Sequence, residues 1–243
     1  MGAAFTDNIL ALDTATAIFS VALGTPEGNW YCEADAGTHH SRLLMDITDF
    51  LFKKSGLKPA DLSRVFCMRG PGSFTGLRIG FSSAKALALS LNIPFTAVSS
   101  LDCIAYPYSI WPGLVIPLID ARKKSWFCAL YAGGCKLVPD IDADADAIIS
   151  EISAQKPEYK QQPVLLTGPD ADKFYSEITE KTENEANIAF TLAPCSRYGS
   201  ARELLAIAKT QKKINNSINY NCGPEYLRKS DAEINSGKQI KNV

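Results

Sequence analysis

The sequence predicts an α/β protein made of two domains that share one order of elements, and three observations support this prediction. The first hundred residues contain three β-rich runs followed by alternating helical and extended segments, which combine an antiparallel meander with parallel crossovers. Segments of the same kind begin again near residue 114. An offset of 107 positions superimposes the strand end at Asp13 on the strand end at Asp120. Ribonuclease-H-like and actin-like domains share this order, so we expect two such domains, the second reduced.

The elements of the first half follow from β-rich runs, helical periodicity and turn residues. The segment from Thr25 to Gly28 is typical of a hairpin turn, Gly56 stops the first helix, and Ser73 is placed to cap the second. In chain order we expect strands at 8–13, 17–24 and 28–36, a helix at 41–54, a strand at 62–68, a helix at 74–91 and a strand at 94–98.

The second half is shorter and more polar. Alternating acidic residues from Asp140 to Asp146 lack the glycine and the distant Glu of a calcium loop, so we expect a solvated helix start there. Residues 1–106 should form the first domain, 107–196 the second, and 197–243 a C-terminal helix and tail. We expect strands at 114–120, 125–132 and near 136–138, a helix at 143–154, a strand at 164–167, a helix from residue 170, a strand near 188–192 and a helix at 200–209.

The composition of the 243 residues is that of an ordinary globular protein. Hydrophobic residues make up 46% of the chain, and 25 Lys and Arg against 26 Asp and Glu give a net charge of −1, which argues against a free-standing basic nucleic-acid binder. No secretory signal is visible, and the longest uncharged run, 103–119, contains three prolines. We therefore expect a cytoplasmic protein that does not cross a membrane.

The cysteines are odd in number, and no two form a C-x-x-C pair. This pattern predicts reduced thiols rather than a disulfide framework or a zinc site. The seven cysteines are Cys32, Cys67, Cys103, Cys128, Cys135, Cys195 and Cys222.

A glycine-rich segment, GPGSFTGLRIG at 70–80, joins a predicted strand to a predicted helix. Such a junction can hold a phosphate, but the spacing matches neither a Walker A loop nor G-x-G-x-x-G, so a tight turn is the favoured interpretation. Small residues recur at every fourth position of this helix and give one smooth face, on which a helix of this chain or of a partner can pack closely. The small residues are Gly76, Gly80, Ala84 and Ala88.

The helix predicted at 41–54 is apolar on more than one side. Leu43, Ile47 and Phe50 form one stripe, and Leu44 and Leu51 form a second. A helix that lies on a sheet with its outer face in water shows a narrower stripe. The excess predicts a partner surface, with a covering element from this chain as the alternative.

Two predicted strands end in an Asp. Actin-like phosphotransferases hold phosphate and metal with hairpins of this kind, but their turns need glycine, because a side chain there collides with the phosphate. Here alanine and threonine occupy the first turn and two basic residues occupy the second. We interpret the site as the vestige of a nucleotide site, with a self-sufficient actin-like ATPase or phosphotransferase as the alternative. The residues concerned are Asp13, Thr14, Gly72, Ser73 and Asp120.

The two histidines, His39 and His40, are adjacent in the sequence. Neighbouring positions on a helix diverge by about 100°, so the pair does not bind one metal as an i,i+4 pair does. The sequence contains neither H-E-x-x-H nor G-x-S-x-G. A metallopeptidase and a serine hydrolase are therefore disfavoured.

Several segments resemble the TsaB (YeaZ) family of tRNA threonylcarbamoyladenosine biosynthesis proteins, which are degenerate relatives of the transferase TsaD. They occur in order along nearly the whole chain. The matching segments are ILALDTAT at 9–16, HSRLL at 40–44, GPGSFTGLRIG at 70–80, AKALALSLNIP at 84–94, AVSSLD at 97–102, IPLIDARKK at 116–124 and PEYLR at 224–228.

The resemblance implies that the chain is a non-catalytic subunit, not an enzyme. TsaD-type proteins bind a metal through two histidines with H-x-x-x-H spacing on one helix, whereas the matching helix here has Leu43 and Leu44 one turn after His39 and His40. The resemblance also implies that the helices at 41–54 and 74–91 pack against a TsaD-type transferase as a four-helix bundle. The implied interface residues are Leu43, Leu44, Ile47, Phe50, Leu51, Gly76, Gly80, Ala84 and Ala88.

The implied complex includes a TsaE-type ATPase and modifies the adenosine next to the anticodon of tRNA. It uses ATP, a metal and threonylcarbamoyl-adenylate, and we expect none of these cofactors to bind this chain by itself. The family also forms homodimers through the same helices, which stays an alternative. A glycoprotease-like metallopeptidase is the third functional alternative. For the basic residues after Cys195, the alternatives are contact with tRNA and a solvated tail.

Overall fold

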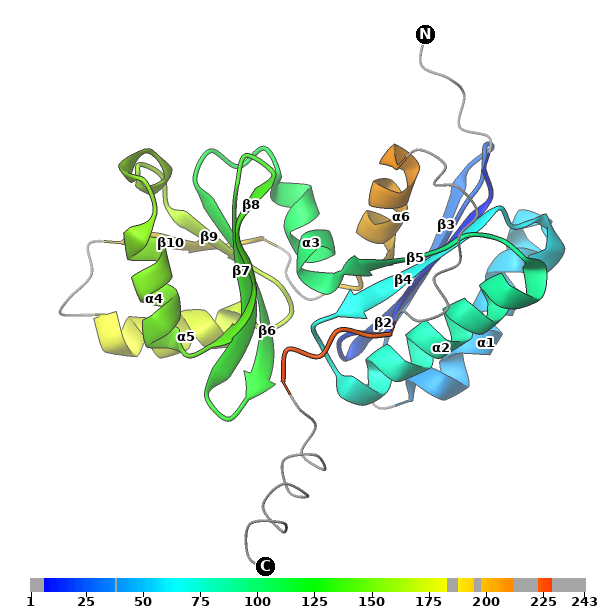
Figure 1. The fold of residues 1–243 in the computed structure, drawn as a ribbon, viewed down its shortest axis with the longest axis horizontal. Coiled ribbons are helices and arrows are strands. Elements are labelled where there is room, and N and C mark those ends of the chain that lie inside the picture. The colour runs from blue at the N-terminus through cyan, green and yellow to red at the C-terminus, as the bar shows by residue number, and fades with distance from the viewer. Residues whose placement is uncertain (1–6, 38, 183–187, 195–197, 212–222, 229–243) are drawn as a thin grey trace, which may run out of the picture.

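The computed structural model describes residues 7–37, 39–182, 188–194, 198–211 and 223–228. Two α/β lobes lie side by side, each built on a five-stranded sheet, with α3 between them (Figure 1). No helix in the described part of the chain is long and apolar enough to span a bilayer.

The first sheet has the strand order β3-β2-β1-β4-β5. β1, β2 and β3 form an antiparallel meander, whereas β1, β4 and β5 are parallel. Every residue of β1 and β2 is buried, because helices cover both faces of the sheet. The strands are β1 (Ile9–Asp13), β2 (Ile18–Gly24), β3 (Asn29–Asp35), β4 (Arg64–Gly70) and β5 (Phe95–Ser99).

Helices α1 and α2 pack on one face of this sheet, and α3 and α6 pack on the other. Gly56 ends α1 with a φ of 75°, in the left-handed region that glycine adopts readily. Helix α6, expected in a separate C-terminal part, contributes to the core of the first domain. The helices are α1 (His40–Ser55), α2 (Phe74–Leu91), α3 (Ser100–Ala105) and α6 (Ala201–Thr210), with short 3-10 turns at Pro59–Asp61 and Tyr106–Tyr108.

The second sheet has the order β8-β7-β6-β9-β10, which repeats the topology of the first. The prediction of two domains with one order of elements is therefore confirmed. Helices α4 and α5 cover one face, and α3 lies against the other. The elements are β6 (Leu114–Arg122), β7 (Ser125–Ala132), β8 (Cys135–Ala143), α4 (Ala145–Ala154), β9 (Val164–Thr167), α5 (Ala171–Thr182) and β10 (Phe190–Leu192), with a 3-10 turn at Pro157–Lys160.

Helix α3 was not predicted from the sequence, although it joins the two domains. Its Cys103 belongs to the core of the first domain, and its Leu101 and Ile104 pack against the second sheet. A polar contact reinforces this junction, because Tyr131 of β7 donates its hydroxyl to Asp102 at 2.6 Å. The six residues that directly follow β5 thus contribute to the cores of both domains.

The expectation of a solvated helix start at 140–146 is wrong for its first half. Asp140 and Asp142 belong to β8, where Asp140 accepts a hydrogen bond from Ser99 at 2.6 Å and pairs with Lys136. Asp144 does cap α4, since its carboxylate accepts the amide hydrogen of Ala147 at 2.9 Å. Side chains from distant segments pair with the acidic residues and keep β8 in the sheet.

Five of the seven cysteines fall within the described residues, and all five are free thiols. Burial raises the pKa of the Cys128 thiol to about 12, so this side chain is neutral and unreactive at physiological pH. Cys195 and Cys222 lie outside the described residues.

Candidate functional site

A cleft of about 500 Å³ lies between the two domains. The turn after β1 and the start of α2 form one wall, and the turn after β6 forms the other. Of the five residues expected at a vestigial nucleotide site, Gly72, Ser73 and Asp120 line this cleft. Asp13 and Thr14 are buried beside it and do not line it.

Asp13 is 2% exposed and both of its carboxylate oxygens are engaged by backbone amides. Oδ1 accepts from Ala15 at 2.9 Å, and Oδ2 accepts from Ser200, just before α6, at 2.8 Å. Burial raises the pKa of Asp13 above its ordinary value, although the two amides oppose this shift. The carboxylate therefore ties the end of β1 to the start of α6 and is not directed at the cleft.

The glycine-rich segment packs directly on the turn after β1. A Cβ at Gly76 would lie 2.0 Å from the carbonyl oxygen of Thr14, and a Cβ at Gly80 would lie 2.2 Å from the Thr14 hydroxyl oxygen. That hydroxyl donates to the carbonyl of Gly76 at 2.7 Å. The glycines thus let α2 approach the hairpin, which agrees with the favoured interpretation of a tight turn.

Amide groups at the start of α2 are already engaged. The hydroxyl of Ser73 accepts the amide hydrogen of Gly76 at 3.3 Å, and the amide of Ser73 itself donates to Ala15 at 2.7 Å. Fewer donors are left for an anion than a bare helix N-terminus offers.

The turn after β6 differs in conformation and in charge. Arg122, Lys123 and Lys124 are exposed and have φ values of 61°, 56° and 60°, in the left-handed region that disfavours residues other than glycine. Asp120 accepts the amide hydrogen of Arg122 at 2.6 Å and forms a longer ion pair of 3.5 Å with Lys173. Bulky basic side chains, rather than a glycine turn, therefore form this wall of the cleft.

The histidines do not fit the metal site of a TsaD-type protein. His40 is buried, with its ring edge-on to Phe19 at 6.0 Å between centroids, and the next helical turn carries Leu43 and Leu44. Among the residues that the structure describes, no group of three or more His, Cys, Asp and Glu side chains could hold a metal ion.

Six of the nine residues expected at a partner interface face the interior of this chain, which corrects that expectation. Leu44 and Leu51 of α1 lie in the core beneath the helix, and the small residues of α2 pack on β1 and on the turn that follows it. The alternative of a covering element from this chain therefore applies to them. The buried residues are Leu44, Leu51, Gly76, Gly80, Ala84 and Ala88.

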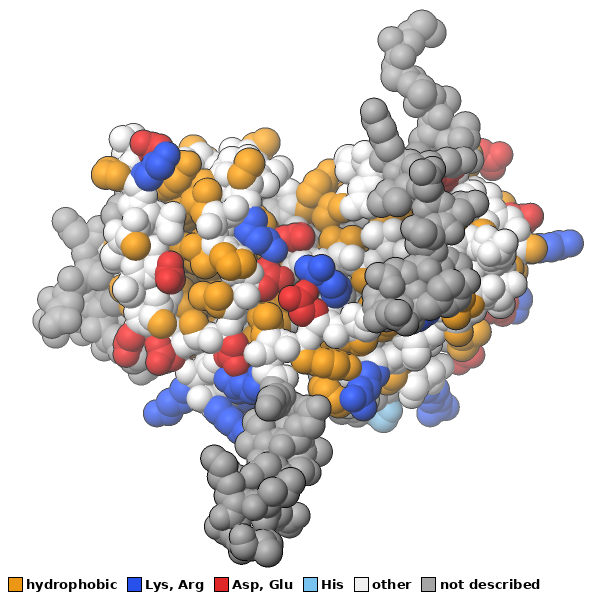
Figure 2. Space-filling model, viewed as in Figure 1, with side chains coloured by type: hydrophobic (Ala, Val, Ile, Leu, Met, Phe, Trp, Pro, Cys, Tyr) orange, Lys and Arg blue, Asp and Glu red, His pale blue; other side chains and the backbone are white. Residues whose placement is uncertain are grey.

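The outer surfaces of α1 and α2 nevertheless expose several apolar side chains among charged ones. Met45 is 68% exposed, Phe50 49% and Leu89 39%, while Leu43 and Ile47 are half-buried at the edge of the core. Hydrophobic side chains reach the surface along the lower edge of this lobe, between Lys and Arg side chains (Figure 2). Three of the nine expected interface residues, Leu43, Ile47 and Phe50, belong to this outer surface.

Small residues also line the outside of α2, at positions that the sequence interpretation did not select. Ser82, Ala86 and Ser90 are exposed and recur every fourth residue. The hydroxyl of Ser82 donates to the Arg78 carbonyl at 2.6 Å, and that of Ser90 donates to the Leu87 carbonyl at 2.8 Å. Because these hydroxyls already donate to carbonyls of the same helix, removing water from this surface costs little free energy. The side chains are also small, so another helix can approach closely.

The sequence interpretation also missed the structural role of Arg228. Residues 224–228 served in the sequence interpretation only as one of the segments that resemble the TsaB family, and the partner of Arg228 lies far away in the sequence. Arg228 forms an ion pair with Asp142 of β8, 86 residues away, at 2.7 Å. Residues 225–228 thereby form part of the cleft wall.

Comparisons with known proteins agree with one another. A family model described as "TsaD: tRNA N6-adenosine threonylcarbamoyltransferase" matches residues 34–236. The chain is 30% identical over 227 residues to the Bacillus subtilis tRNA threonylcarbamoyladenosine biosynthesis protein TsaB, covering 93% of this chain and 96% of that one. It is 40% identical to the Escherichia coli TsaB over 128 residues, which are 51% of this chain and 54% of that one.

A solved structure shows the same fold. The Pseudomonas aeruginosa protein described as similar to peptidase YEAZ superimposes with a TM-score of 0.71 at 22% sequence identity. The superposition covers 92% of this chain and 100% of that chain. The two-domain architecture is thus shared along almost the whole length.

Proposed function

The chain belongs to the TsaB (YeaZ) family, whose members act in tRNA threonylcarbamoyladenosine biosynthesis, and we propose that it is a non-catalytic subunit that binds a TsaD-type transferase and holds it in a competent state. The outer surface of α1 and α2 is the binding face. It comprises Met45, Phe50 and Leu89, the half-buried Leu43, Ile47, Ile79 and Leu87, and the small residues Ser82, Ala86 and Ser90.

One observation carries this proposal. Exposed apolar side chains of α1 lie next to an α2 surface whose hydroxyl groups are already bonded within the helix. Large side chains supply apolar area, and small ones let the backbone of a second helix come near. Pairing with a second copy of this chain would use the same surface.

The cleft geometry supports a non-catalytic role. In an actin-like enzyme, Asp13 would be the carboxylate beside the phosphate or the metal. Here both of its carboxylate oxygens accept hydrogen bonds from backbone amides. The glycines of 70–80 leave room for Thr14 and Ala15 of this chain, not for a phosphate. In our proposal ATP, the metal and threonylcarbamoyl-adenylate are therefore handled by the transferase and a TsaE-type ATPase, and tRNA is reached through the complex.

Charge placed on the outer face tests the proposal. We expect Ala86→Arg and Met45→Glu each to weaken binding to a TsaD-type transferase by at least about thirtyfold, because each puts a charge into a desolvated contact. Binding is measured by titration calorimetry, and tRNA modification is assayed with the reconstituted proteins. Leu44 and Ala84 are unsuitable sites, since a charge at these buried positions would unfold the domain.

Ala154→Arg is the matched control, because Ala154 is an exposed helical alanine of the second domain, away from α1 and α2. It should leave binding and modification unchanged. Wild-type affinity in both face variants would overturn the proposed interface. Modification of tRNA by this chain without any transferase would overturn the non-catalytic role.

A further inference from the structure

Residues 223–228 cross from the first domain to the second at the cleft. In Figure 1 this orange-red segment passes between α2 and β6. Three contacts attach the segment along its length, two to the first domain and one to the second. Each is made by residues that the proposed binding face does not include.

The first contact joins the segment to the end of β4. The amide of Glu225 donates to the Arg69 carbonyl at 2.8 Å, and the Glu225 carboxylate pairs with the Arg69 guanidinium at 2.8 Å. A Cβ at Gly70 would lie 2.6 Å from the carbonyl oxygen of Glu225. Glycine at this position therefore leaves room for the segment to lie along the strand end.

The second contact lies on the first turns of α2. The Tyr226 ring packs on the Phe74 ring at 4.6 Å between centroids. The Arg78 guanidinium lies 3.9 Å from the Phe74 ring centroid and donates to the Tyr226 hydroxyl at 3.1 Å. Arg78 is one turn before Ser82 on the exposed side of α2, so Tyr226 holds a side chain at the edge of the proposed binding face.

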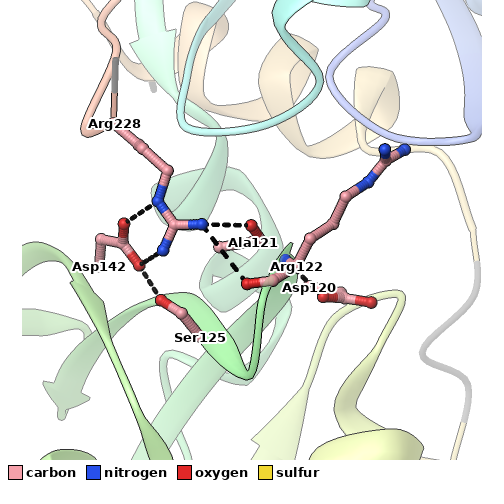
Figure 3. Close-up of polar contacts among 6 residues, drawn as sticks. All are labelled: Asp120, Ala121, Arg122, Ser125, Asp142 and Arg228. Atoms are coloured by element: carbon pink, nitrogen blue, oxygen red, sulfur yellow. Dashed lines mark hydrogen bonds and ion pairs between the residues drawn. The ribbon is translucent and has the colours of Figure 1, made fainter. Parts of the chain in front are cut away.

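The third contact is made with the second domain (Figure 3). Arg228 forms a two-point ion pair with Asp142, at 2.7 and 2.9 Å, and donates to the carbonyl of Ala121 at 2.9 Å. Ser125 also donates to Asp142. The side chain of Arg122 extends away from this group (Figure 3). Arg228 thus joins β8 to the left-handed turn after β6. The planar guanidinium of an arginine can donate to the carboxylate and to the carbonyl at the same time in a fixed geometry, which the ammonium group of a lysine does less well.

We propose that residues 223–228 form an interdomain strap: the Arg228–Asp142 pair holds the two domains at one angle, and Tyr226 links that angle to the partner-binding face of α2. The link to a partner rests on the proposed function, whereas the strap itself does not. If the transferase contacts α2 while Tyr226 holds Arg78 in place, it binds the chain with the strap attached more tightly than the chain with the strap detached. By linkage, binding of the transferase then strengthens the strap.

Hydrogen exchange of the full chain tests the strap. The Glu225 amide is the reporter, because it bonds to the first domain while Arg228 bonds to the second. We expect Arg228→Gln and Asp142→Asn to speed exchange of this amide by at least about tenfold, and Arg228→Lys to have a smaller effect. Amides of α1 and α4 should keep their protection, which shows that both domains stay folded. Unchanged Glu225 protection in Arg228→Gln would overturn the strap.

The affinity for a TsaD-type transferase tests the link. Arg228→Gln should weaken binding by about fivefold or more, while Lys156→Gln, at an exposed site of the second domain, should not. Faster Glu225 exchange with wild-type affinity would overturn the link to α2. If the wild-type chain does not bind the transferase at all, the proposed function fails, and the exchange experiment still decides whether the strap exists.

Discussion

The two domains share one strand order but differ in the burial and conformation of the turn that follows their central strand. In the first domain α2 covers this turn, and Asp13 at the strand end is buried. In the second domain the equivalent turn is exposed, carries three basic residues in the left-handed conformation, and is bound by Arg228 from the far end of the chain. One topology therefore supports a closed hairpin in one copy and an open one in the other.

Glycines explain this difference. Helix α2 has Gly76 and Gly80 where it meets the hairpin, whereas α5 contains no glycine and packs through Ala171 and Phe174. Without Cβ atoms α2 comes near enough for Thr14 to bond to its backbone. The space between helix and hairpin that a ligand would need is therefore filled by protein in the first domain.

The largest expected effect comes from restoring a Cβ between α2 and its hairpin. Gly76→Ala would place a carbon 2.0 Å from the Thr14 carbonyl oxygen, which belongs to the backbone and cannot turn aside as a flexible side chain could. We expect a loss of about 4 kcal/mol in the free energy of unfolding, or failure to fold. Urea unfolding followed by circular dichroism measures this loss.

Gly28→Ala is the control for that experiment. A Cβ at Gly28 would have its nearest contact at 3.7 Å, with the Trp30 ring, so its cost should stay below about 1 kcal/mol. Equal costs at the two glycines would mean that helix approach is not what distinguishes the first hairpin.

The next effect concerns α6, which covers only the first sheet. Arg64 pairs with Asp7 at 3.0 Å and donates to the carbonyls of Ala208 and Gln211 at the end of α6, at 3.2 and 3.1 Å. Arg64→Leu leaves a buried carboxylate and the helix end without this partner, so we expect a loss of about 3 kcal/mol. Lys53→Met, which removes a cation from an exposed pair, should cost less than about 0.5 kcal/mol.

Thermal unfolding of both variants measures the two losses. In hydrogen exchange, the amides of α6 in Arg64→Leu should lose their protection before those of the rest of the domain. A cost for Arg64→Leu as small as that for Lys53→Met would show that α6 does not depend on Arg64 for its position.

The sheets could be predicted from the sequence because β-rich runs and turn residues are local signals. Helix α3 could not, since six residues that follow β5 without a loop are too few to show a helical period. The strand predicted near 136–138 ended too early for another reason. Asp140 and Asp142 have the composition of a solvated segment, and their partners Ser99 and Arg228 lie 41 and 86 residues away in the sequence. Edge strands tolerate such charges.

The site shows the same limit. A small-residue face on α2 was predicted correctly, but spacing alone does not say which way a face points. Thr14, 62 residues before Gly76, decides that the glycines face inward. The outward small residues, such as Ala86, follow once the inward side is known. Periodicity gives the pattern of a helix, and contacts between distant segments give its orientation.

The smallest effect compares the two strand-end carboxylates. Asp13→Asn replaces one of the two carboxylate oxygens, each of which accepts from a backbone amide, with an NH2 group that can only donate. Because the site is buried, we expect the free energy of unfolding to fall by about 2 kcal/mol. Asp120→Asn keeps an oxygen for the Arg122 amide and loses only a long, partly exposed ion pair with Lys173, so it should cost less than about 1 kcal/mol. Equal losses would make the two hairpins equivalent, against the comparison above.

The pH dependence of these variants sharpens the same comparison. Burial raises the pKa of Asp13 in the folded protein, so between its ordinary and its raised value the folded state holds more protons than the unfolded state. Stability contributed by Asp13 must therefore fall as pH rises through that window, opposite to a salt-bridged carboxylate. The advantage of wild type over Asp13→Asn should shrink from pH 4 towards pH 7. A growing advantage would mean that the two amides, not burial, dominate at Asp13.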